Sequence, residues 1–332
     1  MTKISSKNRP QGSNWGDWGD DDKLGHLNYI TDEIVLEAIK EVKVGKRFCL
    51  SLPLDYPGNN VLNSVRKEPI LKPIIREKAE YYNFNWQNID PRFTDIASDD
   101  SVLLDLQFST QWDGLCHRGE IVDVGNGDEP LYYNGHRSKV TQGDYENILP
   151  IGIEHMASSC VQGRGILIDL KNEVGTYPRV EINHEMLISI LDKQNINIKQ
   201  GDILCFWTGL DELILSNSKK ENPKLINSCA VLDGWDHKLL DWIKNSKIAA
   251  IVSDNLAIEA IGKEIPAEHN GSYLPLHNQC LFKSGIHLGE LWHLADLANW
   301  LLTNNRNSFL LTAPPLRLKG AAGSPVTPVA TV

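Results

Sequence analysis

Four side chains between residues 107 and 117 are of types that bind metal ions or transfer protons. Gln107, Gln111, Asp113 and His117 stand in the segment LQFSTQWDGLCH, which is otherwise largely apolar. Alternate residues of a strand share a face, so the two glutamines and Asp113 would point the same way if the chain were extended. His117 follows Gly114, which permits a turn. The spacing predicts a cluster of ligands or proton-transfer groups, and it fits a half-exposed strand with a polar face equally well.

Short apolar segments alternate with amphipathic ones along the rest of the chain. Strands are expected at residues 48–54, 102–108, 166–170, 203–207, 248–252 and 308–312. Helices are expected at residues 31–42, 145–160, 185–194, 239–244 and 294–302. Residues 61–99 are polar and irregular, and we expect them to run over one face of the molecule. This alternation predicts a mixed α/β fold.

Composition and charge narrow the class of protein. The 332 residues carry a formal net charge of -10, which argues against a protein that binds the phosphates of nucleic acids. The polar N-terminus lacks the apolar core of a signal peptide, and no stretch approaches the roughly 18–20 apolar residues that span a bilayer. Six scattered cysteines without a CxxC pair indicate reduced thiols. We therefore expect a cytoplasmic protein without a nucleic-acid or membrane partner.

The chain contains no internal repeat and no low-complexity linker that would divide it. We therefore expect a single domain over residues 15–332, preceded by a flexible N-terminal segment over residues 1–14.

The segment LQFSTQWDGLCH resembles the HxGTHxDxPxH signature of the cyclase family, which includes kynurenine formamidase and isatin hydrolase. Gln107 and Gln111 stand at the first two histidines, Thr110 at the threonine, Asp113 at the aspartate and His117 at the last histidine. Two ligand histidines of the signature are thus glutamines here. The segment TQWDGLCH resembles the corresponding sequence of a subgroup of the family in which glutamine occupies these positions.

Ser109 and Leu115 also depart from the signature, because it has glycine and proline there. Five further segments resemble the family in the same order along the chain. They are WGDDDKLGHLN at residues 18–28, IGIEHMASSCVQGRGILIDL at 151–170, IKQGDILCFWTG at 198–209, VSDNLAIEA at 252–260 and LHNQCLFKSGIHLGELWHLADLA at 276–298. The resemblance therefore extends over nearly the whole chain from Trp15 onward.

The resemblance implies a metal site. It places ligands at Gln107, Gln111 and Asp113, with His277 and Glu290 completing the same or a second site. Amide oxygen is a harder and weaker donor than imidazole nitrogen, so glutamine ligands shift preference from zinc toward oxygen-loving ions such as manganese. The expected cofactor is a divalent ion, Zn²⁺ or Mn²⁺.

The resemblance also implies a fold and an activity. The fold would be the swivelling β/β/α domain of the family, commonly dimeric, so we expect a homodimer or higher homo-oligomer. The activity would be arylformamidase-like hydrolysis of a small-molecule amide, formamide, lactam or lactone, with ring-bearing molecules among the expected substrates. His117 would be the general acid/base and Thr110 would help to hold the oxyanion. Two alternatives stay open: a metal-dependent lyase or cyclase acting on a polyketide- or sugar-derived substrate, and a metal-free binding protein derived from the family.

Overall fold

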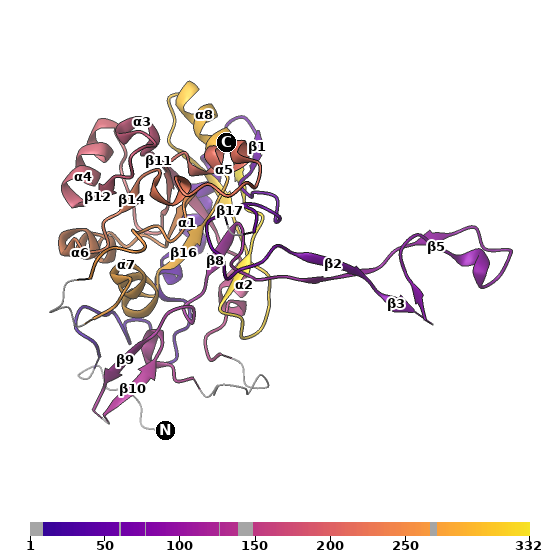
Figure 1. Cartoon of the computed structure of the whole chain (residues 1–332). Coiled ribbons are helices and arrows are strands. Elements are labelled where there is room, and N and C mark those ends of the chain that lie inside the picture. The colour runs from indigo at the N-terminus through magenta and orange to yellow at the C-terminus, as the bar shows by residue number, and fades with distance from the viewer. Residues whose placement is uncertain (1–8, 60, 77, 126, 139–148, 266–270) are drawn as a thin grey trace.

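A nine-stranded sheet forms the centre of the molecule in the computed structural model (Figure 1). The structure describes residues 9–59, 61–76, 78–125, 127–138, 149–265 and 271–332. The strand order is β1 (Arg47–Cys49), β19 (Val329–Thr331), β17 (Ser308–Thr312), β11 (Gln162–Asp169), β13 (Ile203–Trp207), β15 (Ala250–Ser253), β16 (His287–Glu290), β8 (Gln111–Asp113) and β18 (Gly323–Pro325). The four strands β11, β13, β15 and β16 are parallel to their neighbours in this series. The flanking strands pair antiparallel.

The central strands are buried on both faces, and their alternate residues belong to two different hydrophobic cores. On β13, Leu204 and Phe206 belong to one core, whereas Ile203, Cys205 and Trp207 belong to the other. Continuous apolar runs of this kind are typical of parallel strands that helices cover on both sides. The sequence pattern of these strands therefore fixes a layered fold with the sheet in the middle.

Helices cover both faces of the sheet. The first core includes residues of α4 (His184–Lys193), α6 (His237–Asn245) and α7 (Pro275–His277), which lie together in Figure 1, and of the π-helix η6 (Asn278–Ser284). The second core includes residues of α2 (Glu154–Ser158) and α8 (Ala295–Thr303). The N-cap side chains of Thr31, Asn183 and Asp236 accept from the first turns of α1 (Asp32–Ile39), α4 and α6.

Shorter elements complete the body. They are η2 (Gly25–Tyr29), β9 (Glu120–Asp123), β10 (Asp128–Leu131), η4 (Tyr133–Gly135), α3 (Lys171–Val174), β12 (Glu181–Ile182), α5 (Leu210–Asn217), η5 (Leu225–Asn227) and β14 (Val231–Leu232). No helix in the described ranges is long and apolar enough to cross a membrane. All six cysteines are free thiols.

A long arm leaves the body between residues 70 and 103 (Figure 1). Three short antiparallel pairs build it: β2 (Ile70–Pro73) with β7 (Asp100–Leu103), β3 (Ile75–Arg76) with β4 (Ala79–Glu80), and β5 (Phe84–Asn85) with β6 (Ile96–Ala97). The 3-10 helix η3 (Trp86–Asn88) lies between β5 and β6. The expectation that residues 61–99 run over one face of the body was wrong, because these pairs bond to one another and project outward.

The expected elements are largely present. The bounds of β13 and β17 match the predicted strands, and α1, α4, α6 and α8 fall within two or three residues of the predicted helices. The predicted strand 102–108 was wrong, since β7 ends at Leu103 and the next sheet strand begins at Gln111. The predicted helix 145–160 falls partly outside the described residues, and its described part contains only the short α2.

The mixed α/β class is confirmed, and the swivelling β/β/α detail stays a prediction. Residues 1–8 of the expected flexible segment lie outside the described residues. Its described end is anchored, because Ser13 and Asn14 are buried and the Asn14 side chain donates to the Ser284 carbonyl at 2.8 Å.

A buried carboxylate fixes the start of α8 from a distant segment. Asp211, which is fully buried, accepts from the backbone N–H groups of Leu294 and Ala295 at 2.8 Å each. It also bonds to His293 Nδ1 at 2.9 Å. These contacts satisfy N–H groups that no residue inside the helix can reach, and they tie α5 to α8.

We predict that Asp211→Ala lowers the free energy of unfolding by about 2–4 kcal/mol, because it leaves the α8 N-terminus and His293 without their buried acceptor. Denaturant unfolding followed by circular dichroism measures this change. The matched control is Asp241→Ala, which removes an exposed carboxylate from α6 and should shift stability by no more than about 0.5 kcal/mol. Similar losses in the two variants would contradict the assigned role.

Candidate functional site

Two neighbouring strands carry three of the polar residues that the sequence singled out. On β8, Gln111 and Asp113 point to one face, and Trp112 between them packs edge-on against Trp292 on the other, with ring centroids 5.0 Å apart. Glu290 at the end of β16 pairs in register with Gln111. The antiparallel pairing of β8 with β16 therefore sets two carboxylates and an amide side by side.

His277 approaches these strands from the helical layer of the first core. It ends α7, and the π-helix η6 follows immediately. Glu259 holds it from behind: the Glu259 Oε1 accepts from the backbone N–H of His277 at 2.8 Å and lies 2.7 Å from His277 Nδ1. The opposite ring nitrogen, Nε2, lies 3.3 Å from Glu290 Oε1. The imidazole is thus oriented by one carboxylate toward another.

The N-terminal segment holds η6 in place. The indole N–H of Trp15 donates to the Phe282 carbonyl at 2.8 Å, and the backbone N–H of His26 donates to the Gly285 carbonyl at 2.9 Å. A Cβ on Gly25 would come within 2.1 Å of the same Gly285 carbonyl oxygen, so this close approach requires glycine. The N-terminal segment therefore contacts the π-helix that begins directly after His277.

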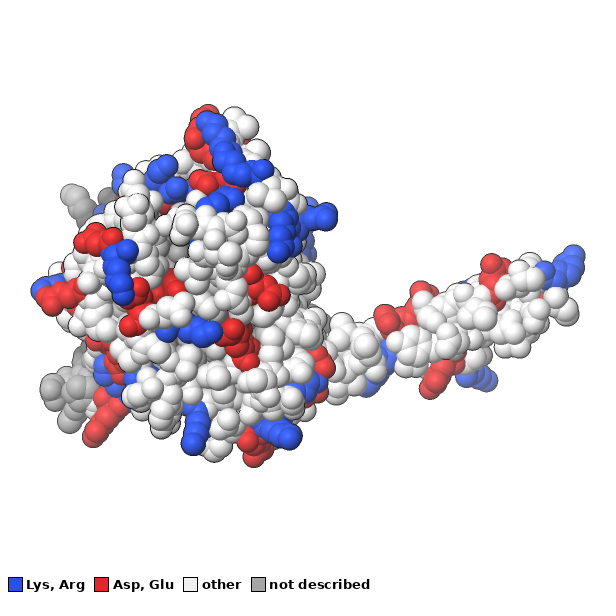
Figure 2. Space-filling view, turned by 90° about the horizontal axis from the view of Figure 1, so that it is seen from above, with Lys and Arg blue, Asp and Glu red and all other residues white. Residues whose placement is uncertain are grey.

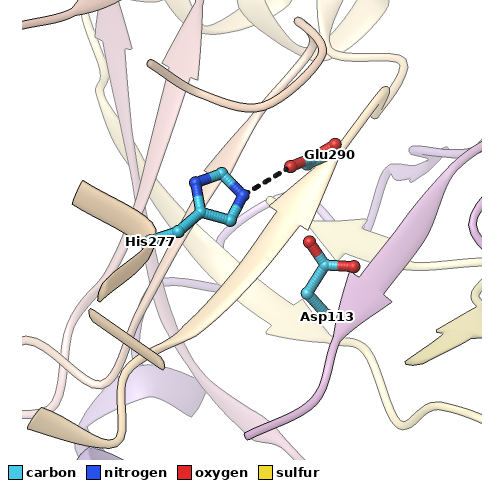
Figure 3. Close-up of side chains that lie close together, drawn as sticks. All are labelled: Asp113, His277 and Glu290. Carbon is cyan, nitrogen blue, oxygen red and sulfur yellow. Dashed lines mark ion pairs between the residues drawn. The ribbon is translucent and has the colours of Figure 1, made fainter. Parts of the chain in front are cut away.

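Asp113, His277 and Glu290 form a compact buried group, which Figure 3 shows with the three side chains directed toward one another. One ligand atom from each lies within 4.8 Å of the others. Their exposed fractions are 1%, 2% and 3%, so bulk water does not screen their charges. Carboxylate and imidazole at this spacing form a donor set that divalent ions bind.

Two oxygen atoms beside this group have no hydrogen-bond partner. Gln111 Nε2 faces Asp113 Oδ1 at 3.3 Å and Glu290 Oε2 at 3.4 Å, which leaves Gln111 Oε1 and Asp113 Oδ2 buried and unpaired. Buried acceptors without a donor are costly and rare in native proteins. A cation bound by the carboxylates would satisfy Asp113 Oδ2, and a half-turn of the Gln111 amide would direct its oxygen instead of its nitrogen toward the same ion. The residues present therefore fit a metal ion.

The protonation of the group reflects an excess of buried negative charge. Burial and the negative charge of Glu290 raise the pKa of Asp113 to about 8. Burial by itself would lower the pKa of His277, but the carboxylates of Glu259 and Glu290 raise it to about 9. Burial opposes ionisation of Glu290 as well, yet its hydrogen bond with His277 and the positive charge there lower its pKa. Asp113 and His277 therefore retain protons that offset part of the buried negative charge, a role that a bound metal ion would also fill.

His117 lies at the edge of the group and, unlike His277, has a lowered pKa and a partly exposed side chain. Its Nε2 is 3.8 Å from Asp113 Oδ2, and its ring centroid is 6.5 Å from that of His277. Burial and the nearby positive charge of His277 lower the pKa of His117 to about 4. The ring is therefore neutral near pH 7 and has a free lone pair. Its side chain is 19% exposed, which leaves it reachable from solvent.

Gln107 and Thr110 hold positions that the strand pattern did not predict. Gln107 lies in a turn before β8, with its backbone carbonyl accepting from Arg66 Nη1 at 2.5 Å. Its amide lies against Gly323 of β18, where a Cβ would come within 2.5 Å of the Gln107 Nε2. Thr110 is fully buried, and its hydroxyl donates to the Leu291 carbonyl at 2.5 Å and accepts from the Leu52 N–H at 2.9 Å. The Thr110 hydroxyl proton is therefore engaged in fixing β8.

Sequence reasoning missed two charged residues near the group. Glu259 orients His277, and the positive charge of Arg66 lowers the pKa of Glu290. Glu259 lies in VSDNLAIEA between the apolar residues Ile258 and Ala260, and this flanking could have marked it as buried. Nothing in the polar sequence around Arg66 distinguishes it from the other basic residues.

The sequence and the fold both match known proteins. A family model described as "Putative cyclase" matches residues 50–260. The solved structure of a novel cyclase is 29% identical, with 96% of this chain and 97% of that chain covered and a TM-score of 0.76. No curated protein matches the sequence.

More distant structures share the fold. Isatin hydrolase A from Labrenzia aggregata, solved with benzyl benzoate bound, is 14% identical, with 92% of this chain and 98% of that chain covered and a TM-score of 0.56. Isatin hydrolase A from Ralstonia solanacearum is 12% identical, with 86% and 91% covered and a TM-score of 0.54. The family model covers residues 50–260, which is well over half of the chain. The chain therefore belongs to the cyclase family.

Proposed function

We propose that the protein is a metal-dependent hydrolase of a small-molecule amide, formamide, lactam or lactone, with His117 as general acid/base. One observation carries this proposal: a buried group of two carboxylates and an oriented imidazole, with unpaired acceptor oxygens, lies beside a neutral histidine that solvent can reach. Isatin hydrolases of the same fold support hydrolysis as the reaction class, because they show that this scaffold accommodates it.

The residues that would hold the ion are Asp113, His277 and Glu290, with Gln111 Oε1 as a further oxygen donor. Gln107 stays a predicted ligand whose amide lies near Gly323. We propose Mn²⁺ or Zn²⁺, since the donor set mixes one imidazole with carboxylate and amide oxygens. Such an ion, when bound, polarises a carbonyl and lowers the pKa of water, which makes hydrolysis feasible near neutral pH.

Glu259 would act on a bound ion through His277. By accepting from Nδ1–H, it would leave the lone pair of Nε2 for the ion in place of the proton that Nε2 shares with Glu290. The backbone N–H of His277 bonds to the same carboxylate oxygen and so holds Glu259 beside the ring, while rotation of the ring would break its Nδ1 and Nε2 contacts. This arrangement preorganises the only nitrogen donor that the described part of the chain brings into the group.

His117 would move the proton. Its neutral ring can take a proton from an attacking water and return it to the leaving nitrogen or oxygen. Burial makes the imidazolium unstable in the resting protein, so the proton would be held only briefly. The short distance to Asp113 keeps the ring beside the reacting centre.

We predict a graded loss of metal affinity in two variants. Asp113→Asn removes an anionic ligand and should weaken Mn²⁺ or Zn²⁺ binding by more than about 100-fold, whereas Glu259→Gln should weaken it by about 10–100-fold, as for other residues that orient a ligand. Chelator competition measures both affinities. The control is Glu185→Gln, an exposed carboxylate on α4. Unchanged affinity in Asp113→Asn would refute the site.

We predict that His117→Gln lowers kcat by at least about 100-fold while metal content stays at the wild-type level. The substrates are found first, by screening the metal-loaded protein against N-formyl aryl amines, isatins, lactones, cyclic imides and aryl esters. Identification of the products distinguishes hydrolysis from a lyase or cyclase reaction. Loss of metal in His117→Gln would make His117 a ligand rather than the acid/base.

We propose further that the protein is a homodimer or higher homo-oligomer and that the arm, residues 70–103, lies between copies. An isolated two-stranded ribbon is marginally stable in water, and this one exposes many apolar side chains. Leu71, Ile75, Ile96 and Leu103 are each between 63% and 68% exposed. Figure 2 shows the arm as a narrow rod whose surface is mostly neither acidic nor basic. Apolar surface on this scale favours burial against another protein surface, and a second copy can exchange arms by twofold symmetry.

We predict that replacing Leu71, Ile75 and Ile96 together by Asn converts the wild-type oligomer to a monomer. The apolar area that drives association is lost, whereas the body is untouched. Light scattering after size exclusion measures the mass. The matched control replaces three exposed apolar residues of the body, Leu36, Val44 and Ile121, in the same way. A monomeric wild type, or an arm variant that keeps the wild-type mass, would contradict the proposal.

A further inference from the structure

Arg66 is a cation beside the buried group, and one edge of its guanidinium is unoccupied. Its Nη1 donates to the Gln107 carbonyl at 2.5 Å, and its side chain is half-buried. Among the described residues, its Nε and Nη2 have neither a hydrogen-bond acceptor nor an ion-pair partner. Neither nitrogen belongs to the fully buried side-chain atoms that lack a partner, so this edge is accessible.

Other arginines of the chain show what this edge binds. Arg92, Arg137 and Arg164 each pair with a carboxylate through Nε and Nη2, at distances between 2.6 and 2.9 Å. These N–H groups point the same way and match the two oxygens of a carboxylate. Arg66 keeps the same edge free, because its bond to Gln107 uses Nη1 instead. It therefore suits an anion that the described part of the chain does not supply.

Arg66 lies at the end of the sheet that carries the buried group. Gln107, whose carbonyl it binds, places its amide against Gly323, and Gly323 pairs in register with Asp113. Arg66 and Gln107 also line a cavity of about 10 Å³ together with Leu291, the first residue after β16. The guanidinium is therefore held by the segments that lead into β8 and out of β16.

The charge of Arg66 acts on the residues of the site, although the described structure shows no ion pair between them. Burial is the largest influence on the pKa values of Asp113, His117 and Glu290, and the positive charge of Arg66 contributes to a lower value at each. A cation that acts on the acid/base and on both carboxylates without pairing with them lies beside the space where a substrate would react.

Hydrolysis of a carboxylic acid derivative places negative charge on the carbonyl oxygen. Water forms a bond to the carbonyl carbon, the electron pair of C=O moves onto the oxygen, and one proton of the water passes to His117. The tetrahedral centre then expels the leaving nitrogen or oxygen, which takes that proton from His117. The acid that results gives its remaining proton to solvent and is a carboxylate near pH 7.

Other donors near the group are already engaged. Thr110, which the sequence predicted to hold the oxyanion, donates its hydroxyl proton to the Leu291 carbonyl. The amide nitrogen of Gln111 faces the two carboxylates of the group. Those buried carboxylates repel a further negative charge. An oxyanion at this site therefore needs a cationic donor, and such donors are worth most where water is excluded.

We propose that Arg66 is a catalytic residue that binds the carbonyl oxygen of the substrate through Nε and Nη2, holds the oxyanion, and then pairs with the carboxylate product. The proposal rests on the proposed hydrolase function, and it adds the side chain that receives the negative charge. Because the free edge matches a carboxylate, the protein should bind a carboxylate more tightly than a neutral amide of the same shape.

Calorimetric titration of the Mn²⁺-loaded protein with benzoate and with benzamide tests this edge without any turnover. We expect Arg66→Gln to weaken benzoate binding by at least about tenfold, the loss typical of a hydrogen bond to a charged group, and to leave benzamide binding unchanged. Arg66→Lys should fall between, because a point charge lacks the paired N–H groups. Equal benzoate affinity in wild type and Arg66→Gln, or no benzoate binding by the wild type, would overturn the proposal.

Arg118→Gln is the matched control. Arg118 is exposed, and its positive charge adds, as that of Arg66 does, to the lowering of the His117 pKa by burial. The control therefore reproduces the effect on His117 and leaves the free edge of Arg66 intact, so benzoate binding and kcat should stay at the wild-type level. Metal affinity by chelator competition should not fall in Arg66→Gln. Loss of metal in that variant would make Arg66 a structural support and overturn the proposal.

Kinetics separates the role of Arg66 from the proposed function. With a substrate from the screen, Arg66→Gln should lower kcat by about 100-fold or more, as for other lost oxyanion donors, with a much smaller change in KM. Added guanidinium should restore part of the activity of Arg66→Gly, which a structural role would not produce. Wild-type kcat in Arg66→Gln would overturn the role of Arg66 and leave the hydrolase standing. Loss of benzoate binding in Arg66→Gln, without hydrolysis of any screened compound by the wild type, would overturn the hydrolase and leave Arg66 as an anion-binding residue.

Discussion

The interior of this protein contains three buried carboxylates around His277, more negative charge than that imidazole neutralises, and the protonation of the group follows from this excess. Glu259, Glu290 and Asp113 are at most 3% exposed, and all three lie around His277. Buried carboxylates repel one another strongly and are stable only when they are paired, protonated or bound to a cation. In the metal-free protein, protons on Asp113 and His277 provide part of the compensation. A divalent ion would provide it more completely, which links metal binding to the stability of the fold.

Contacts on both sides fix the strand that carries Gln111 and Asp113. Gln111 and Asp113 come from a three-residue strand held on both sides, by β16 and by β18. Trp112 anchors that strand in the opposite core, with its indole N–H donating to the Ala313 carbonyl at 2.9 Å. Thr110 bonds it to the Leu291 backbone. The polar face is thus positioned by the apolar face of the same strand, so packing and site geometry cannot vary independently.

Sequence reasoning named three residues that the structure brings together in one buried group, and its errors about the elements around them have a physical cause. Asp113, His277 and Glu290 were identified from motifs, although the last two are far from Asp113 in sequence. Gln107 was assigned to a strand because VLLDLQF is apolar, whereas β7 ends at Leu103 and a turn follows. Only Val102 and Leu103 of that run pair with β2 in the arm, and a non-local pairing of this kind leaves no local signal. Apolar residues in the arm look like core residues in the sequence, although Ile96 is 68% exposed.

The order of strands in the sheet has a consequence for synthesis of the protein on the ribosome. Within the described part of the chain, strand β8 at residues 111–113 pairs with two strands, β16 and β18, the latter at residues 323–325. At about 5–20 residues per second, translation needs roughly 10–40 s to proceed from Asp113 to Gly323. During most of that interval the nascent chain carries β8 without either neighbour, and the charged group has not yet formed. An unpaired strand can associate with the wrong partner, so correct assembly of the centre depends on how the emerging chain is protected before its partner strands are made.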